Sequence, residues 1–447
     1  MGLFDRLRGN DGPRVAFIGI DGVPYELIAN HPETFETLHA LMDRGTGGPI
    51  DSIVPPESSA CWPSLTTGVN PGKTGVYGFQ DREIGTYETY VPTGRDVQAE
   101  RIWDRVHEAG RNATVINVPV TVPPQRTIQR MVSGFLSTDL DRAAHPSELS
   151  DELNDLKYRI DVNATLGHEA DKTEFIADSH KTLDARTSTF LEYIDRDDWD
   201  LFVGVYMTTD RINHFLFADF EQGGEYYDEF MEFYRTLDQH IARVIDALPE
   251  DVTLFVASDH GFTSLNYEVH CNRWLEEQGL LEYTDTTHDQ LGDIASHTSV
   301  YSLIPGRFYV NLVDREPRGS VSQSEYDSVL SDLETALESL TGPNGEPVIE
   351  WTVRGNEVFY GPHVDIAPDL VAIPTDGFDL KSGFSGEGPI FDQGPRNGMH
   401  TFDDATLITD DPGIEITETD LLDIAPTILA AMDIDYEETA FDGTSLY

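Results

Sequence analysis

Short apolar runs that alternate with longer amphipathic segments are the feature that most restricts the fold of this chain. The runs are rich in β-branched residues and cover residues 15–20, 114–118, 201–206, 252–258 and 369–373. Segments of helical periodicity accompany them at residues 33–44, 100–108, 173–195 and 226–248. Strands that alternate with helices build a mostly parallel sheet covered by helices on both faces. We therefore predict an α/β fold.

Between the fourth and the fifth apolar run, the chain does not follow the regular alternation of apolar runs and amphipathic segments. It contains helix candidates at 272–278 and 324–340, a strand candidate at 307–312 and the turn sequence GPNG at 342–345. Because the sheet pattern resumes only after this stretch, we predict that it is an insertion. The predicted organisation is a core formed by residues 1–265 and 366–447, with an inserted cap subdomain over residues 266–365.

The charge of the chain is strongly one-sided. Asp and Glu number 81 against 29 Lys and Arg, which gives a net charge of −52, and the acids are spread along the whole chain. At molar salt the Debye length falls to about 3 Å, so such self-repulsion is screened. We therefore predict a halophilic protein of the haloarchaeal kind, with an ordinary acidic protein as the alternative. A surface of this sign opposes binding to nucleic acid.

Cysteine content and hydropathy favour a reduced compartment. Cys61 and Cys271 are the only cysteines, too few for a disulfide framework or a Cys-rich zinc site. The N-terminus has no apolar segment of the signal-peptide type, and no run of about 20 apolar residues occurs. We predict a cytoplasmic protein without a transmembrane segment. Nothing in the sequence predicts the oligomeric state.

Acidic residues and histidines stand where the predicted strands end. Asp21 follows the run at 15–20, Asp210 follows the run at 201–206, and Asp259 and His260 follow the run at 252–258. Ligands of open parallel sheets bind beyond the carboxyl ends of the strands. One such aspartate is usual in a turn, but three strands that deliver ligand-type residues to one edge indicate a metal site. Mixed Asp and His sets suit zinc or manganese better than calcium.

Two further histidines are candidate metal ligands, and the sequence supports one of them better than the other. His214 stands four residues after Asp210, so a helix that begins near Thr209 would place both side chains on one face, within reach of one metal. His400 lies in GPRNGMHTFDD, which we interpret as a glycine-rich loop. An isolated loop histidine is usually solvated, so the pattern around His400 does not by itself make it a ligand.

The nucleophile candidate lies in the segment VPPESSACWPSLTTG, residues 54–68. The Pro-Pro pair imposes an extended entry, and a helix is predicted from Ser58 or Ser59 to Thr67, ending at Gly68. Ser58 would then stand at the helix N-terminus, where free N–H groups and the dipole favour an anion. From this segment alone, a simple helix-capping role is the alternative.

The order of these residues along the chain resembles that of the alkaline phosphatase superfamily. Within it, the chain most resembles the archaeal form of the type I phosphodiesterase/nucleotide pyrophosphatase family. The resemblance covers nearly the whole chain and includes PP-x-[ST]-x(8)-TG-x-x-PG-x-x-G at 55–75, SDHGF at 258–262 and DLLDIAPTIL at 420–429. It implies an alkaline-phosphatase-like sheet sandwiched by helices, with an inserted cap.

The resemblance also implies two divalent metal ions, zinc or manganese. One would be held by Asp210, His214 and His400, and the other by Asp21, Asp259 and His260, with Ser58 between the two. It implies a hydrolase of phosphate esters, of the phosphodiesterase or nucleotide pyrophosphatase type. The substrate would be a small-molecule or lipid-linked ester, and a covalent intermediate would form on Ser58.

A second interpretation of the nucleophile segment starts from Cys61. The sequence Cys-Trp-Pro-Ser at 61–64 resembles the start of the sulfatase motif, and sulfatases share this fold. However, Leu65 stands where that motif has arginine, and the family spacing to Thr67 selects Ser58. We therefore predict Cys61 to be a core residue, with Ser59 as a minor competitor to Ser58.

At one position the chain differs from the family, and this difference leaves the type of phosphate ester undetermined. The family carries an asparagine that binds phosphate oxygen at the register of Phe79, and Gln80 and Arg82 are the candidates to replace it. The preference for monoesters or diesters is therefore not predicted. The alternatives are a phosphomonoesterase, a sulfatase, a mutase of the cofactor-independent phosphoglycerate type and a non-catalytic binding protein. A phosphoethanolamine-type transferase usually has membrane spans, which are not found here.

Overall fold

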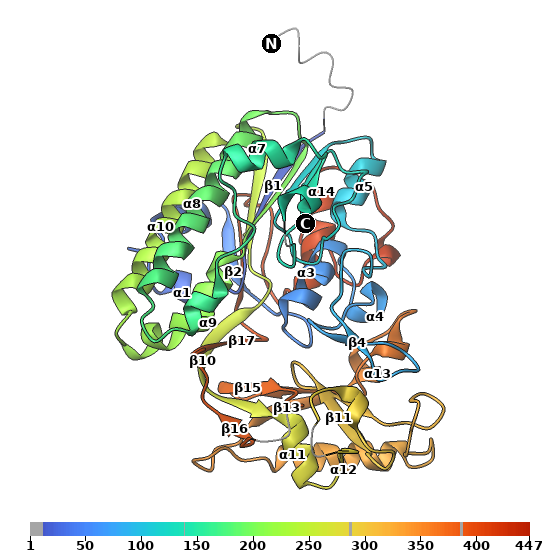
Figure 1. Cartoon of the computed structure of the whole chain (residues 1–447). Coiled ribbons are helices and arrows are strands. Elements are labelled where there is room, and N and C mark those ends of the chain that lie inside the picture. Colours follow the sequence, from blue (N-terminus) through green and yellow to red (C-terminus); the bar gives the residue numbers. More distant parts are fainter. Residues whose placement is uncertain (1–11, 138, 286–287, 385–387) are drawn as a thin grey trace.

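The computed structural model describes residues 12–137, 139–285, 288–384 and 388–447 (Figure 1). The N-terminal residues on which the signal-peptide prediction rests lie outside these ranges. Figure 1 shows a larger lobe built around one sheet and a smaller lobe below it, with β10 and β17 running between the two. Among the described residues, no helix combines the length and apolar character that crossing a membrane requires.

An eight-stranded sheet forms the centre of the larger lobe. Its order is β2 (Thr46–Ile50), β18 (Ala405–Thr409), β9 (Val252–Ala257), β1 (Arg14–Ile20), β8 (Leu201–Tyr206), β5 (Ala113–Ile116), β6 (Arg130–Val132) and β7 (Ala144–His145). The five strands from β9 to β6 are parallel, and Phe17 pairs with Val203 and Phe255. β18 and β7 are antiparallel to their parallel neighbours. The prediction of a mostly parallel sheet is therefore confirmed.

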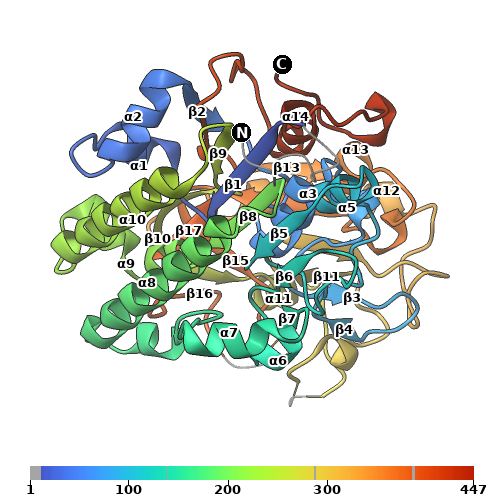
Figure 2. The same ribbon diagram turned by 90° about the horizontal axis from the view of Figure 1, so that it is seen from above.

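Both faces of this sheet are buried beneath helices. Ala16, Ile18 and Ile20 pack under α2 (Glu36–Arg44), α8 (Thr173–Asp195), α9 (Thr208–Gln222) and α10 (Tyr227–Ala247). Val15 and Phe17 face α3 (Ser58–Thr67), α5 (Ile102–Glu108) and α14 (Ile424–Ala431). Figure 2 shows α8 and α10 on one side of β1 and α5 and α14 on the other. Each large apolar side chain fully buried here contributes about 1.5–3 kcal/mol.

Further short elements lie outside the sheet and the helices that cover it. They are α1 (Tyr25–Ala29), α4 (Pro71–Thr74), β3 (Asp81–Arg82), β4 (Thr89–Tyr90), α6 (Leu140–Ala143), α7 (Leu149–Asp155) and 3-10 turns at Ala164–His168, Leu421–Asp423 and Glu438–Ala440.

The smaller lobe has its own sheets and core. One sheet has the order β11 (Val300–Leu303), β12 (Arg307–Val310), β14 (Leu370–Pro374) and β13 (Ile349–Arg354). In the other, β10 (Gly261–His270) pairs with β15 (Gly377–Lys381), β16 (Phe391–Asp392) and β17 (Gly398–Thr401). The lobe also holds α11 (Cys271–Glu277), α12 (Tyr326–Glu338), α13 (Gly355–Val358) and 3-10 turns at Leu291–Asp293 and Val364–Ile366. The predicted helices at 272–278 and 324–340 and the predicted strand at 307–312 are confirmed, with shifted ends.

The predicted core strand at 369–373 is wrong in its placement. These residues form β14, which lies between β12 and β13 in the smaller lobe. The strand that completes the core sheet is β18. Because a buried β-branched run has the same pattern in any covered sheet, the sequence does not distinguish the two positions. The predicted boundary at residue 366 therefore falls inside the smaller lobe.

Candidate functional site

The acidic residues predicted at strand ends meet at one edge of the core sheet. Asp21 directly follows β1, Asp210 lies in the first turn of α9 after β8, and Asp259 follows β9 by two residues. All three side chains are at most 1% exposed. Three carboxylates buried side by side are unfavourable unless cations or hydrogen-bond donors compensate their charge.

Asp210, His214 and His400 form one cluster. The Nε2 atom of His214 lies 3.3 Å and that of His400 lies 3.2 Å from Asp210 Oδ1, and the two Nε2 atoms are 3.2 Å apart. Asp210 and His214 share a face of α9, as their spacing predicts. His400 lies on β17, which pairs with β10, so the interpretation of its segment as a loop is wrong. The paired strand holds His400 against the core.

Asp21, Asp259 and His260 form the second cluster. Their ligand atoms all lie within 4.8 Å of one another, with His260 Nε2 at 3.4 Å from Asp259 Oδ2. Trp62 donates its indole N–H to Asp21 Oδ2 at 2.6 Å, which fixes that carboxylate. His260 also groups with Asp210 and His400 within the same limit. The two clusters are therefore contiguous.

The three histidines are oriented in the same way. Each Nδ1 lies 3.0–3.2 Å from a backbone carbonyl, that of Gly398 for His214, Gly261 for His260 and Pro56 for His400. A carbonyl accepts only, so each Nδ1 carries a proton and donates. When the rings are neutral, their Nε2 atoms present a lone pair to the clusters. This is the arrangement of histidines that ligate metals. Burial lowers the pKa of His214 and His260 and favours this state, whereas the hydrogen bond with Asp210 raises the pKa of His400.

The electrostatics fit bound cations. Burial, together with the charges of Asp259 and Asp210, raises the pKa of Asp21 well above its usual range, and burial raises the pKa of Asp259 to about 7. Burial lowers the pKa of His214 to about 4, which favours the neutral ring that metals need. Among the described residues, Asp259 Oδ2 is buried without a hydrogen-bond donor. An orphaned carboxylate oxygen beside imidazole lone pairs is suited to a divalent ion.

Ser58, the first residue of α3, borders the second cluster. Its Oγ lies 3.1 Å from His260 Nε2 and 3.4 Å from Asp21 Oδ1. The predicted helix and its end at Gly68, which has a left-handed φ of 67°, are confirmed. Cys61 is buried in the apolar core, with Sγ 3.3 Å from Ser52 Oγ. The core position predicted for Cys61 is therefore confirmed.

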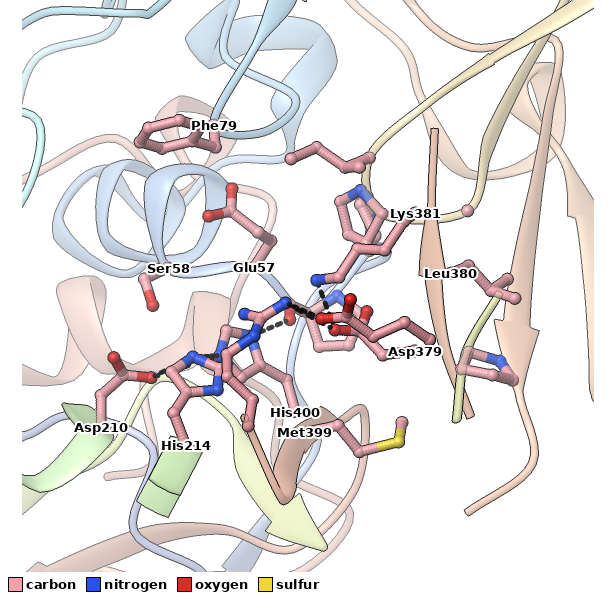
Figure 3. A pocket seen from close by; sticks show the side chains of 18 of the residues that line it. Glu57, Ser58, Phe79, Asp210, His214, Asp379, Leu380, Lys381, Met399 and His400 are labelled. Atoms are coloured by element: carbon pink, nitrogen blue, oxygen red, sulfur yellow. Dashed lines mark hydrogen bonds and ion pairs between the residues drawn. The ribbon is translucent and has the colours of Figure 1, made fainter. Parts of the chain in front are cut away.

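A pocket of about 500 Å³ opens beside Ser58 between the two lobes. Figure 3 shows Ser58, Asp210, His214 and His400 on one side of the pocket and Asp379, Leu380 and Lys381 on the other. The sequence interpretation missed Lys381 and Arg396, because strand pairing in the smaller lobe brings distant segments to the pocket, and it missed Phe135, which follows β6 of the core sheet. It also missed Arg211, whose position next to Asp210 was an available signal.

Phe79 lines the pocket, whereas neither candidate to replace the family asparagine does. Gln80 donates its side-chain amide to Thr89 at 2.6 Å. The Arg82 guanidinium is buried in an ion pair with Glu316. Both candidates for the role of the asparagine are thus held by partners outside the pocket lining.

Solved structures share this fold. Phosphonoacetate hydrolase from Sinorhizobium meliloti 1021, in complex with phosphonoformate, matches with a TM-score of 0.62 at 16% identity, over 96% of this chain and 98% of that chain. An inactive form of murine ectonucleotide pyrophosphatase/phosphodiesterase 5, in complex with AMP, matches with a TM-score of 0.59 at 13% identity, over 97% of both chains.

The comparison with family models is more specific. A search of curated protein sequences gives no match. The model of type I phosphodiesterases/nucleotide pyrophosphatases matches residues 15–403, a span that contains both clusters and Ser58. Membership in this family makes the chain a phosphoester hydrolase of the alkaline phosphatase superfamily. The chain belongs to the type I phosphodiesterase/nucleotide pyrophosphatase family.

Proposed function

We propose that this protein is a two-metal phosphodiesterase in which Ser58 attacks phosphorus. The observation that carries the proposal is the place of the Ser58 hydroxyl, within 3.4 Å of both His260 and Asp21 and open to the pocket. A serine hydroxyl is a weak nucleophile unless a neighbouring group lowers its pKa. Its position at the N-terminus of α3 also favours the anionic phosphate group.

The two clusters supply the ligands for the metals. Asp210, His214 and His400 would hold one ion, and Asp21, Asp259 and His260 the other. When bound, such ions lower the pKa of a nearby hydroxyl and neutralise charge on phosphate oxygens. The nitrogen and oxygen donor set suits zinc, with manganese as the second choice.

The reaction has two displacements at phosphorus. In the first, a bond forms between Ser58 Oγ and phosphorus, the bond from phosphorus to the leaving oxygen breaks, and the proton of the Ser58 hydroxyl ends on the departing alcohol. In the second, water attacks phosphorus, the Oγ–P bond breaks, and one proton of the water returns to Oγ. His260 and Asp21 hold Oγ on the pocket side of α3 for both steps. Because each displacement inverts phosphorus, the overall reaction retains configuration.

Hydrolysis of model esters tests the reaction class. We expect bis-p-nitrophenyl phosphate to be cleaved faster than p-nitrophenyl phosphate or p-nitrophenyl sulfate, at molar KCl with zinc or manganese. Cleavage of the sulfate alone would contradict the proposal. No turnover of any ester by protein with two ions bound would favour a binding protein.

Substitution of the nucleophile tests the assignment of Ser58. Ser58→Ala is expected to lower turnover by roughly a thousandfold or more while the metal content stays at two ions per chain. Cys61→Ala, three residues along the same helix, serves as the control and should keep most of the activity. Loss of activity in a folded Cys61→Ala protein, with Ser58→Ala active, would show that the nucleophile is misassigned.

The proposal includes the cellular location of the protein and the size of its substrate. Its net charge of −52 supports a cytoplasm of high salt as its location, where repulsion between the acids is screened. The pocket volume of about 500 Å³ supports a small-molecule ester rather than a polymer as substrate.

A further inference from the structure

We propose that the substrate is a phosphodiester with a single negative charge and an apolar substituent, which lies past Phe135 in a second cavity. This inference rests on the proposed function and specifies its substrate class. Two substrate classes are compatible with the proposed function: diesters of an apolar alcohol and nucleoside polyphosphates. The inference selects the first of them.

The second cavity has a volume of about 300 Å³. Its walls are the apolar side chains of Val91, Pro92, Val120, Val122, Phe135 and Leu136. The hydroxyl of Thr93, which also lines the cavity, donates to Asp96 at 2.7 Å and is therefore already satisfied. A polar group placed here would lose its hydrogen bonds to water without replacement, whereas an alkyl chain would gain from burial.

Phe135 lines both this cavity and the active-site pocket, so the two cavities lie on either side of its ring. On the pocket side, Phe79 stacks against Phe135, with ring centroids 6.0 Å apart and planes inclined by 28°. Figure 3 shows Phe79 on the α3 side of the pocket, near Glu57. An apolar substituent of a phosphate held at Ser58 would lie along these rings and extend into the valine-lined cavity.

The charges of the pocket argue against a second phosphate group. Apart from the histidines, the described residues contribute three cationic side chains to the lining: Arg211, Lys381 and Arg396. Arg211 is already paired, with Nη2 at 2.8 Å from Asp161 and Nη1 at 3.0 Å from Asp210.

The two cations of the smaller lobe are also neutralised. Lys381 pairs with Asp379, and Arg396 Nη2 lies 2.7 Å from Glu268 and 3.3 Å from Asp379. Glu57 adds a carboxyl group to the lining, which repels an anion when it is ionised. A polyphosphate would therefore bring further negative charge against side chains whose cations already have carboxylate partners.

A series of p-nitrophenyl alkyl phosphates tests this inference. The ethyl, butyl and octyl esters carry the same charge and differ only in apolar length. We expect kcat/KM to rise with length, by at least tenfold from ethyl to octyl, since each buried methylene adds binding free energy. ATP should be cleaved more slowly than the octyl ester.

A matched pair of variants locates the effect. Val91, 40% exposed at the edge of the cavity, is changed in Val91→Glu, and Val313, 43% exposed and outside it, in Val313→Glu. The octyl-to-ethyl ratio should fall towards one in Val91→Glu and stay at the wild-type value in Val313→Glu. If the ethyl ester is cleaved but length has no effect, or ATP is preferred, this inference is overturned while the proposed function stands. If neither the alkyl esters nor bis-p-nitrophenyl phosphate is cleaved, the proposed function itself fails.

Discussion

The candidate metal ligands are held in place by hydrogen bonds to groups outside the two clusters. The carbonyls of Gly398, Gly261 and Pro56 fix the rings of the three site histidines, and Trp62 fixes Asp21. Such outer contacts orient ligands and raise their basicity. They all come from backbone or core positions, so the site geometry is tied to the packing of the fold.

Asp404 carries a pH-dependent cost to stability. Burial, with the charges of Glu26 and Asp403, raises its pKa to about 7, although the Glu26 backbone N–H donates to it. Between the unfolded value near 4 and this folded value, the folded state binds more protons. The contribution of Asp404 to stability is therefore present at low pH and is lost as pH rises through 7.

Asp404→Asn is expected to remove this loss. Its melting temperature should match that of the wild type near pH 4 and exceed it by about 2 °C at pH 8. Asparagine also tolerates the left-handed backbone at this position, where φ is 64°. Thermal unfolding of both proteins across that pH range measures the difference. A gap that is independent of pH would contradict the assigned ionisation.

At the residue scale, strand ends are the predictable part of the site. Asp21, Asp210 and Asp259 follow recognisable strands, so their convergence follows from a parallel sheet. Ser58 and His400 were supported only by the family resemblance. His400 reaches the site because β17 pairs with β10, across more than 120 residues of sequence. Periodicity contains no information about such pairing.

The turn after β1 shows how an element places a ligand. Gly22 has a φ of 64°, and a Cβ there would lie 3.0 Å from His260 Cε1 and 3.0 Å from Phe262 Cδ2. Gly22→Ala is therefore expected to displace His260 and to weaken metal binding roughly tenfold, besides the strain of about 1–2 kcal/mol.

Gly110→Ala provides the matched control for this turn. Gly110 has a φ of 74°, and no heavy atom of the described residues lies within 4 Å of a Cβ built there. It should lose similar stability and keep full metal affinity. Metal titration and thermal unfolding of both variants separate strain from displacement. Equal metal affinity in the two variants would show that the turn does not position His260.

The sequence predicts the individual strands and helices better than it predicts which of them pack or pair with one another. The strands 14–20, 201–206 and 252–257 and the helices 173–195 and 326–338 have patterns set by their own burial. β14 has the same pattern but belongs to the smaller lobe, because the identity of its pairing partners is not encoded in its own residues. The same limit explains why the pocket residues Lys381 and Arg396 were missed.

The charge of the whole molecule predicts its response to salt. The repulsion of a net charge of −52 acts over about 10 Å at 0.1 M salt and over about 3 Å at 1 M. We expect the melting temperature to rise by roughly 10 °C or more over that interval of KCl. Sucrose, which does not screen charge, should reproduce little of this rise. A melting temperature independent of KCl would contradict the prediction of a halophilic protein.

The central claim for the whole molecule is that two clusters and Ser58 form one two-metal site between the lobes. Anomalous scattering from crystals grown with zinc or manganese tests it most directly. The predicted result is two metal peaks per chain, one bound by Asp210, His214 and His400 and one bound by Asp21, Asp259 and His260, with Ser58 Oγ facing both. A single peak, or peaks bound by other residues, would contradict the claim.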